Sequence, residues 1–373
     1  MPISLTLNQV RYLRLRAQCL VLPVSGLDFI AEGVCRAICG VQAQDLPAAI
    51  LAIRVRSSHL TADKVEQERS EGRLIRTWCM RGTLHLVSSE DAAWLIPFLG
   101  PILLPTHRRR AEQLGWEPVR LAKGIDLLQE SLAAQGPMTR KEIQQLLVNN
   151  SLPSEGQAPI HLIYHAALEG ILCMGADRGK QSTYTAFEDW VGEPHRLTNQ
   201  EAITKLALRY FTGYGPVTPR DFTAWSGLNI NAARQAWGLI GDQIMPVELD
   251  GKSMWMLKSQ LAWLDEFGKN PGVIKLLPRF DTSLLGYSNR DISIAPAYSK
   301  YVHPGGGIIN RVVLSGIGMI LGTWKIEKHQ GRNIVAVELF EPLEGEFIPG
   351  LEAEAADLGR FLNVNTLLRI AIN

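Results

Sequence analysis

Two stretches of the chain repeat one pattern of apolar and polar positions. Residues 135–143 read QGPMTRKEI, and residues 214–222 read YGPVTPRDF. Each stretch has a Gly-Pro turn, then a threonine suited to cap a helix, then a basic, an acidic and an apolar residue that open the helix. This similarity indicates an internal repeat.

The flanks of the two stretches predict the same elements. Apolar residues recur at helical spacing before each stretch, over residues 125–134 and 201–211, and a second helix follows each one. A β-hairpin comes next, at residues 171–187 in the first copy and at 245–257 in the second, where Asp250-Gly251 marks a tight turn. Helix, turn, helix and hairpin is the order of a winged helix, so the sequence predicts two such units.

The N-terminal part predicts a third, less regular copy. Residues 10–20, 27–39 and 47–55 have apolar positions at helical spacing, and residues 80–87 (MRGTLHLV) alternate as a strand does. From residue 273 the pattern changes to apolar, strand-like runs separated by glycines, closed by a helix-like segment near 352–362.

We therefore predict an α+β fold with three tandem winged-helix units followed by a mostly β C-terminal domain. The predicted boundaries are 1–95 for the first winged-helix unit, 96–119 for a helical connection, 120–195 for the second unit, 196–265 for the third, and 266–373 for the C-terminal domain.

Composition is typical of a folded, soluble protein. The chain has 373 residues, of which 46% are hydrophobic and 20% charged, and this length favours several domains. We find neither a signal peptide nor an apolar run of about eighteen residues that could span a membrane. The five cysteines are odd in number and contain no CxxC pair, which argues against a disulfide framework and a four-thiolate zinc site. A cytoplasmic location is expected.

Charge is distributed unevenly. The formal net charge is +1, yet residues 337–359 hold seven acidic and no basic residues, so the other 350 residues carry +8. A mildly basic body could hold an anionic polymer on one face. Many unrelated enzymes share this asymmetry, so the feature alone does not indicate nucleic acid.

The common catalytic motifs are missing. There is no GxSxG elbow, HExxH motif, Walker loop or Rossmann glycine pattern, and Gly305-Gly306-Gly307 is better explained as a turn than as a phosphate cradle. His161 and His165 have the spacing of paired metal ligands on a helix, but no third ligand accompanies them. We therefore expect no metal and no cofactor.

Basic residues provide candidate contacts to DNA. Arg178 and Lys180 fall at a predicted hairpin tip, where wings commonly meet phosphates, although a solvated turn would look the same. Another basic run lies in the predicted helical connection and is either a DNA contact or a solvated charge run; it consists of Arg108, Arg109 and Arg110.

Two glutamines stand between predicted helices. Gln42 and Gln44 precede Asp45-Leu46-Pro47, which has the form of a helix start. In an extended segment, residues two apart point to the same side, so their amides can project together. Two solvated loop amides would give the same pattern.

A resemblance changes this interpretation. Several stretches carry it: residues 5–20 (LTLNQVRYLRLRAQCL), the Gln42-Ala43-Gln44 triplet, residues 76–87 (RTWCMRGTLHLV), residues 276–290 (LLPRFDTSLLGYSNR) and residues 322–324 (GTW). In these, and over essentially its whole length, the chain resembles the AlkZ/YcaQ-type DNA glycosylases. These are bacterial tandem winged-helix proteins that excise alkylated bases and unhook interstrand crosslinks. Members carry Gln-x-Gln or Gln-x-Asp, and this chain is similar to the former, AlkZ-like branch; Cys79 departs from the expected pattern.

The resemblance implies that Gln42 and Gln44 are catalytic. A glutamine is no strong base, but its carbonyl can position a water beneath C1′ of a deoxyribose. Such weak assistance suffices only for a good leaving group, such as a purine made cationic by alkylation at N7 or N3. We expect a monomeric, monofunctional glycosylase acting on double-stranded DNA, with water as the nucleophile and an abasic site as the product.

Other interpretations remain open at this point. A winged-helix transcriptional regulator would read DNA without releasing a base, and a non-enzymatic scaffold would bind lesions and leave them intact. In the RGTLH stretch, Arg81, Thr83 and His85 alternate as on one strand face. They either border the lesion and contact DNA or brace the first unit.

Overall fold

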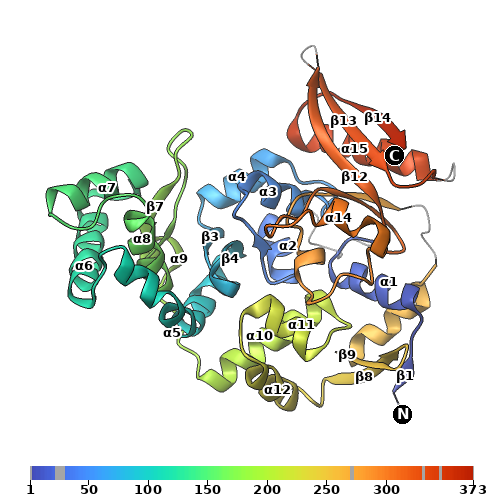
Figure 1. The fold of residues 1–373 in the computed structure, drawn as a ribbon, viewed down its shortest axis with the longest axis horizontal. Coiled ribbons are helices and arrows are strands. Elements are labelled where there is room, and N and C mark those ends of the chain that lie inside the picture. The colour runs from blue at the N-terminus through green and yellow to red at the C-terminus, as the bar shows by residue number, and fades with distance from the viewer. Residues whose placement is uncertain (1, 22–29, 269–272, 330–331, 344–346, 373) are drawn as a thin grey trace. The chain divides into compact units, whose positions relative to one another are not determined.

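The computed structural model describes residues 2–21, 30–268, 273–329, 332–343 and 347–372, which Figure 1 draws in colour. The chain divides into two compact units: Met1–Val65 with Thr204–Asn373, called unit 1 here, and Glu66–Ile203, called unit 2. Residues 27–29 of the helix predicted at 27–39 lie outside the described residues, as do Glu344 and Glu346 of the acidic stretch.

Unit 2 combines a β-sheet with helices (Figure 1). Its strands follow the order β4-β3-β6-β7-β5. They are β3 (Leu74–Trp78), β4 (Leu84–Ser88), β5 (Met138–Thr139), β6 (Leu172–Met174) and β7 (Thr183–Ala186). The helices are α5 (Ser89–Gln113), α6 (Pro118–Gln135), α7 (Arg140–Asn149), α8 (Ala158–Leu168) and α9 (Phe187–Val191). Helix α8 packs against α5, α6 and α7 and is therefore the central helix of this unit.

The elements predicted for residues 120–195 are confirmed. Helices α6, α7 and α8 come first, and the β6–β7 hairpin follows with antiparallel pairing. Thr139 caps α7 in a reciprocal arrangement, because its side chain accepts from the backbone of Glu142 while the Glu142 carboxylate accepts from the backbone N–H of Thr139. The short strand β5, which contains this threonine, pairs with β7.

The prediction of a strand over residues 80–87 is wrong in its first half. A 3-10 turn, Met80–Gly82, precedes strand β4, which starts at Leu84. Arg81 and Gly82 have φ angles of 58° and 69°, in the left-handed region that a strand cannot accommodate. The turn joins β4 to the unpredicted strand β3, and the two strands pair antiparallel from Leu74↔Ser88 to Trp78↔Leu84.

Helix α5 begins before the predicted helical connection at 96–119 and ends inside it, at Gln113. Three prolines lie inside this 25-residue helix, at positions 97, 101 and 105. A proline removes the donor for the carbonyl four residues earlier. The carbonyl of Ala93, which Pro97 leaves without a helical donor, accepts the backbone N–H of His195 at 2.8 Å. Of the helices in the described residues, none is long and apolar enough to cross a membrane.

Unit 1 contains both ends of the chain and two sheets, with strand orders β1-β8-β9 and β10-β11-β12-β13-β14. The strands are β1 (Ile3–Ser4), β2 (Val41–Gln42), β8 (Ile244–Leu249), β9 (Lys252–Leu257), β10 (Ile274–Leu277), β11 (Val312–Ser315), β12 (Ile320–His329), β13 (Arg332–Leu339) and β14 (Thr366–Ile372). The longer helices are α1 (Leu7–Ala17), α2 (Ala31–Ala37), α3 (Leu46–Arg54), α11 (Pro219–Ser226), α12 (Ile230–Leu239) and α15 (Ile348–Leu362). Short segments are α13 (Thr282–Leu285), α14 (Ser299–Val302) and two 3-10 segments, Lys258–Glu266 and Pro296–Tyr298. Helices α4 (Ala62–Ser70) and α10 (Asn199–Tyr214) each contain a boundary between the units.

The second predicted copy has the same elements as the first. Helices α10, α11 and α12 precede the β8–β9 hairpin, which turns at Asp250 and Gly251. Thr218 forms with Asp221 the same reciprocal cap that Thr139 forms in the first copy. The residue before the capping threonine, Val217, forms a bridge with Trp255 of β9, where the first copy has strand β5. The internal repeat therefore extends to backbone pairing.

The C-terminal region is mostly β, as predicted, and helix α15 contains the predicted closing helix. The prediction omitted strand β14, which follows the helix and pairs parallel with β13. Asn363 ends α15 in the left-handed conformation and lets the chain return to the sheet. Unit 1 and unit 2 together have a mixed α+β composition.

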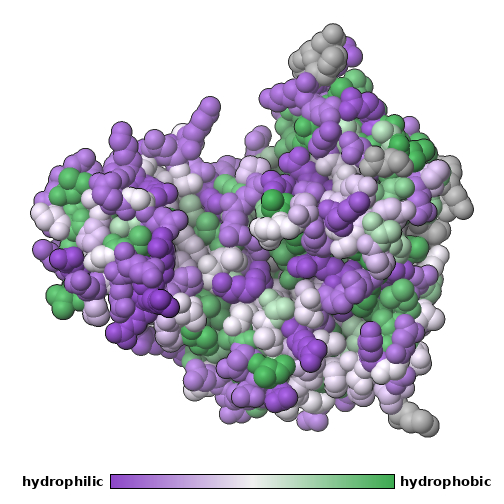
Figure 2. All heavy atoms as spheres, in the orientation of Figure 1, coloured by the Kyte–Doolittle hydropathy of each residue, from purple (hydrophilic) through white to green (hydrophobic). Residues whose placement is uncertain are grey.

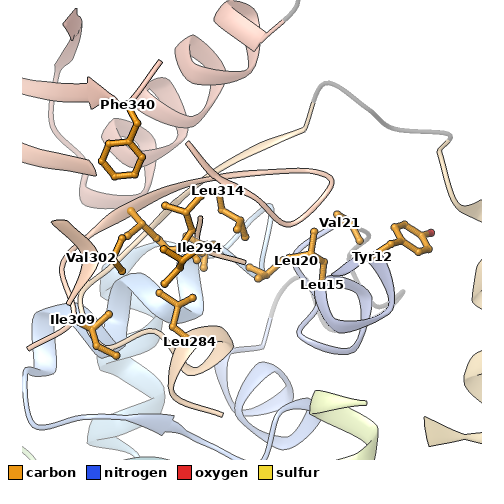
Figure 3. Close-up of a cluster of buried hydrophobic side chains, with 14 residues drawn as sticks. Tyr12, Leu15, Leu20, Val21, Leu284, Ile294, Val302, Ile309, Leu314 and Phe340 are labelled. Atoms are coloured by element: carbon orange, nitrogen blue, oxygen red, sulfur yellow. The ribbon is translucent and has the colours of Figure 1, made fainter. Parts of the chain in front are cut away.

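A hydrophobic core joins the two ends of the chain within unit 1 (Figure 3). Tyr12 and Leu15 of α1 lie in the same cluster as Leu314 of β11, Ile320 of β12 and Phe340 after β13. The side chains of this cluster are nine-tenths or more buried. The N-terminal helix and the C-terminal sheet therefore depend on each other for burial of apolar surface.

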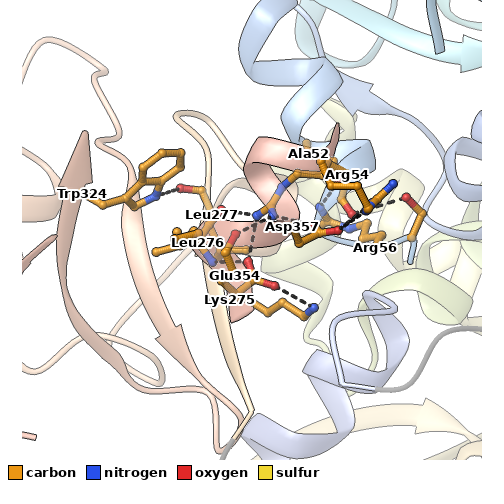
Figure 4. A network of polar contacts seen from close by, with 12 residues as sticks. Ala52, Arg54, Arg56, Lys275, Leu276, Leu277, Trp324, Glu354 and Asp357 are labelled. Atoms are coloured by element: carbon orange, nitrogen blue, oxygen red, sulfur yellow. Dashed lines mark hydrogen bonds and ion pairs between the residues drawn. The ribbon is translucent and has the colours of Figure 1, made fainter. Parts of the chain in front are cut away.

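Two buried arginines at the end of α3 are bound to carboxylates from the C-terminal region (Figure 4). Arg56 forms a bidentate pair with Asp281, with both N···O distances 2.8 Å and both side chains fully buried. Arg54 donates to Glu354 and to Asp357, each at 2.8 Å. Burial alone would raise the pKa of Glu354, but Arg54 and Lys275 lower it to about 2. We use the name arginine clamp for two arginines and the three carboxylates that they bind: Arg54, Arg56, Asp281, Glu354 and Asp357.

Removing one carboxylate of the clamp should destabilise the protein strongly. Asp281→Ala leaves the Arg56 guanidinium buried without its partner, which costs about 3–5 kcal/mol. Chemical denaturation measures the change in the free energy of unfolding. The matched control is Glu327→Gln, which breaks the exposed pair with Arg369 and should cost about 1 kcal/mol or less. Equal losses for the two variants would contradict this account of the clamp.

Candidate active site

The Gln-x-Gln segment is a short extended turn between α2 and α3. Cys39 and Gly40 have positive φ angles of 55° and 88°, which reverse the chain after α2. Val41 and Ala43 are fully buried, whereas Gln42 is half-buried and Gln44 exposed. This alternation is that of an extended strand, so the buried residues anchor the segment and the two amides lie on its opposite side.

Helix α3 starts directly behind the glutamines, as predicted. Asp45 is the N-cap, and its carboxylate accepts the backbone N–H of Ala48 at 3.1 Å. Pro47 occupies the first turn, where its missing N–H costs nothing. A good cap contributes about 1 kcal/mol and fixes the direction in which the chain enters the helix. The position of Gln44 is therefore set by the helix that follows it.

The two glutamine side chains are hydrogen-bonded to each other. Nε2 of Gln42 donates to Oε1 of Gln44 at 2.6 Å. An amide oxygen has two lone pairs and can in general accept two donors, such as a neighbouring amide and a water. The bond also orients both amides, because the donor of one must face the acceptor of the other. The segment thus presents two mutually held amides at the surface of unit 1.

The sequence pattern did not single out two arginines near this segment. Arg279 follows β10, and Arg311 precedes β11. Burial lowers the pKa of Arg311, while the charge of Asp45 acts to raise it and that of Arg279 to lower it, so Asp45 and Arg279 each lie within electrostatic range of Arg311. Arg279 lies in the stretch 276–290 that carried part of the resemblance, and its place in that stretch is the sequence signal that could have identified it.

The RGTLH residues of unit 2 do not share a strand face. Arg81 and Thr83 lie in the turn before β4, and both are half-buried. His85 is inside the unit, 2% exposed, with Nδ1 2.8 Å from the carbonyl oxygen of Thr83. Burial and the charge of Arg81 lower its pKa to about 3, so the ring is neutral at physiological pH. For His85 this burial favours the second interpretation, in which the residue braces the turn.

An aromatic cluster lies under that turn within unit 2. Tyr164 of α8 is surrounded by Trp78, His107, His161 and His165, with ring centroids 4.6 to 6.4 Å away. A Cβ atom on Gly82 would lie 2.7 Å from the Tyr164 hydroxyl, so only glycine allows this close approach of the turn. Among the described residues, no group of His, Cys, Asp and Glu side chains could hold a metal ion.

The basic residues predicted to contact DNA are exposed on unit 2. At the end of α5, Arg108 pairs with Glu112 at 3.0 Å, Arg110 donates to Gln157 at 2.7 Å, and Arg109 is also exposed.

The β6–β7 hairpin carries the other predicted pair at its tip. Arg178 is held by Glu142 at 2.7 Å, and Lys180 is exposed. The tip projects from the unit and is hydrophilic (Figures 1 and 2).

Comparisons with known proteins identify the family. The AlkZ-like DNA glycosylase family matches residues 35–361. The chain belongs to this family. An interstrand DNA cross-link repair glycosylase from Streptomyces sahachiroi is 27% identical over 356 residues, which cover 90% of this chain and 92% of that protein. The solved structure of the DNA glycosylase AlkZ from the same organism has a TM-score of 0.82 and 26% identity, covering 99% of this chain and 100% of the other.

The protein is therefore a DNA glycosylase, and DNA is its substrate. The alternative of a winged-helix regulator without enzymatic activity is not favoured. The glycosylase has no aspartate in its Gln-x-Gln segment, so its candidate catalytic groups are two neutral amides. Their chemistry must therefore rely on hydrogen bonding and dipoles.

Acid should destabilise the glycosylase through its buried histidines. His165 is 6% exposed, and burial, followed by the charges of His161 and His107, lowers its pKa to about 4 from 6.5. Between these values the unfolded chain binds a proton that the folded chain does not, so stability falls as pH falls from about 7 to about 4. His165→Phe should make the free energy of unfolding less pH-dependent, by roughly 2 kcal/mol between pH 8 and pH 5. Denaturant titrations at both pH values measure this, and an unchanged pH dependence would contradict it.

Proposed function

We propose that this glycosylase hydrolyses the N-glycosidic bond of purines that carry a positive charge after alkylation at N7 or N3. Water is the nucleophile, and Gln42 and Gln44 position it. A purine cross-linked through the same ring nitrogen carries the same charge, so interstrand cross-links fall within the proposed substrate class. The name of the Streptomyces sahachiroi relative supports this extension.

The hydrogen bond between the two glutamines is the observation that carries the proposal. A single exposed glutamine samples many rotamers, and ordering it costs conformational entropy. Here the 2.6 Å bond from Gln42 to Gln44 orders both side chains before substrate arrives. An ordered amide oxygen can accept a hydrogen bond from water and hold it below C1′ of the deoxyribose.

The chemistry of the amides limits the substrate. Neither glutamine can take a proton from water at neutral pH, and neither can protonate a leaving base. Their partial negative charge can stabilise an oxocarbenium-like transition state, which is typically worth on the order of 10² to 10³ in rate per group. A cationic purine departs as a neutral base, so it needs no proton from the protein. Undamaged purines are consequently spared.

The rest of the protein holds the duplex. We propose that the chain acts as a monomer and that its winged-helix units, at 1–95, 120–195 and 196–265, grip DNA through phosphates with little sequence readout. The proposed contacts come from the turn before β4, the end of α5 and the tip of the β6–β7 hairpin: Arg81, Thr83, Arg108, Arg109, Arg110, Arg178 and Lys180. The product is an abasic site in an unbroken strand.

Replacing either glutamine by alanine should slow base release by about 10² to 10³. The measurement is single-turnover release from a duplex with one N7-methylguanine, followed by alkaline cleavage of the abasic product. Gln145→Ala is the matched control, because Gln145 is also exposed and hydrogen-bonded to a neighbouring amide, that of Asn149. The proposal fails if Gln42→Ala/Gln44→Ala releases the base as fast as the parent protein.

The direction of the hydrogen bond between the two side-chain amides predicts that glutamate has different effects at positions 42 and 44. Gln44→Glu keeps the acceptor that Gln42 requires, whereas Gln42→Glu places two acceptors against each other. The first variant should therefore keep at least about ten times more activity than the second, since a carboxylate at position 42 has no N–H to donate to Oε1 of Gln44 and the 2.6 Å bond is lost. The same single-turnover assay decides it. A reversed order would contradict the orientation of the two amides described here.

A further inference from the structure

Arg279 and Arg311 lie at the same end of one pair of strands. Strands β10 and β11 are antiparallel, and their register ends with Leu277 opposite Val312. Arg311 directly precedes Val312, and Arg279 comes two residues after Leu277. The two arginines therefore lie at the same end of this strand pair, although they are far apart in the sequence.

Both arginines are held on a rigid frame. The Arg311 guanidinium lies 5.2 Å from the centre of the Trp324 ring, and the indole N–H of Trp324 donates to the carbonyl of Leu277 at 2.7 Å. After Arg279 the chain turns at Phe280, whose φ is 57°. A non-glycine residue in this region is strained, and the next residue, Asp281, is fixed by the arginine clamp.

The positive charge of this pair is only partly matched within the described part of the chain, where the carboxylate of Asp45 acts on Arg311. Neither arginine forms an ion pair with a described carboxylate, and Nε of each is buried without a hydrogen-bond acceptor. Asp45 is near Arg311, but its carboxylate already caps α3. Two half-buried cations near each other cost free energy unless an anion joins them.

We infer that Arg279 and Arg311 bind one phosphodiester of the DNA strand, next to the nucleotide whose sugar lies at Gln42 and Gln44. This deepens the proposed function and rests on it. Arginine suits the task because its planar fork of N–H groups matches phosphate oxygens. The phosphates attached to the damaged nucleotide are the anions that must accompany its sugar to the glutamines. Asp45 directly follows Gln44 and acts electrostatically on Arg311, so Arg311 lies within electrostatic range of the residue next to the proposed water-binding segment.

The two arginines are positioning residues in this scheme. They contact no reacting atom, and they fix the distance between C1′ and the amides by holding the adjacent backbone. Their Gln variants should slow base release by about 10- to 100-fold each, the loss expected for a hydrogen bond to a charged group. Arg369→Gln is the control, because Arg369 belongs to the same unit and its guanidinium is paired with Glu327.

A chemical change in the DNA identifies the partner of the arginines. One phosphodiester 5′ or 3′ of an N7-methylguanine is replaced by an uncharged methylphosphonate, and a third duplex carries this linkage several nucleotides away. At the contacted position the replacement should slow the parent protein as much as Arg279→Gln or Arg311→Gln does. It should add little to the loss in the variant, because both changes remove one interaction. Additive losses at every position would overturn the inference.

A binding measurement separates this site from the proposed chemistry. Affinity for a duplex with a stable abasic-site analogue is titrated against salt, and each arginine lost should lower the slope of log K against log salt by about 1. Arg279→Lys and Arg311→Lys should restore the slope but not the full rate, because lysine keeps the charge and loses the fork. If the Gln variants have the salt slope and the base-release rate of the parent protein, the proposed phosphate site is wrong, while the proposed glycosylase activity is unaffected. Failure of the parent protein to release cationic purines would instead remove the proposed function, and the slopes would still decide the site.

Discussion

The arrangement of unit 1 depends on two cationic side chains at the end of α3 that form ion pairs with carboxylates of the C-terminal region. Arg54 and Arg56 are buried, and a buried guanidinium is tolerated only with carboxylates and hydrogen-bond acceptors around it. Those groups come from Asp281, Glu354 and Asp357. Because α3 begins at the cap behind Gln44, the helix that the clamp holds at one end follows the Gln-x-Gln segment directly at its other end. Two acidic residues of the C-terminal stretch, Glu354 and Asp357, thus form ion pairs within the folded protein.

In the proposed mechanism, selectivity for cationic purines follows from the fact that the two amides carry no charge and cannot exchange protons. A carboxylate in place of Gln44 would activate water more strongly, but it would also bring a full charge to the sugar of any bound nucleotide. Two neutral groups that hold each other at 2.6 Å give order without basicity. The buried Val41 and Ala43 fix the backbone beneath them, so the chemistry rests on a rigid base.

Local features were predictable, and long-range ones were not. The helix caps at Thr139, Thr218 and Asp45 depend on residues a few positions apart, and the sequence states them directly. The tight turn of the β8–β9 hairpin is equally local. By contrast, strand β3 is defined by its pairing with β4, and β14 by its parallel pairing with β13 across helix α15, and neither pairing can be inferred from local sequence. Burial of His85 and the pairing of Arg56 with Asp281 depend on the folded chain, which no spacing rule reveals.

Unit 1 is assembled from both ends of the polypeptide, with unit 2 encoded between them. On the ribosome, unit 2 can fold as soon as its own residues have emerged, whereas α1 and α3 must wait for the last strands of the chain. The helix behind the glutamine segment is therefore not fully supported until residues 281–357 have emerged. A chain that stops before residue 281 lacks the carboxylates that pair with Arg54 and Arg56, so the ion pairs that hold the end of α3 cannot form in it.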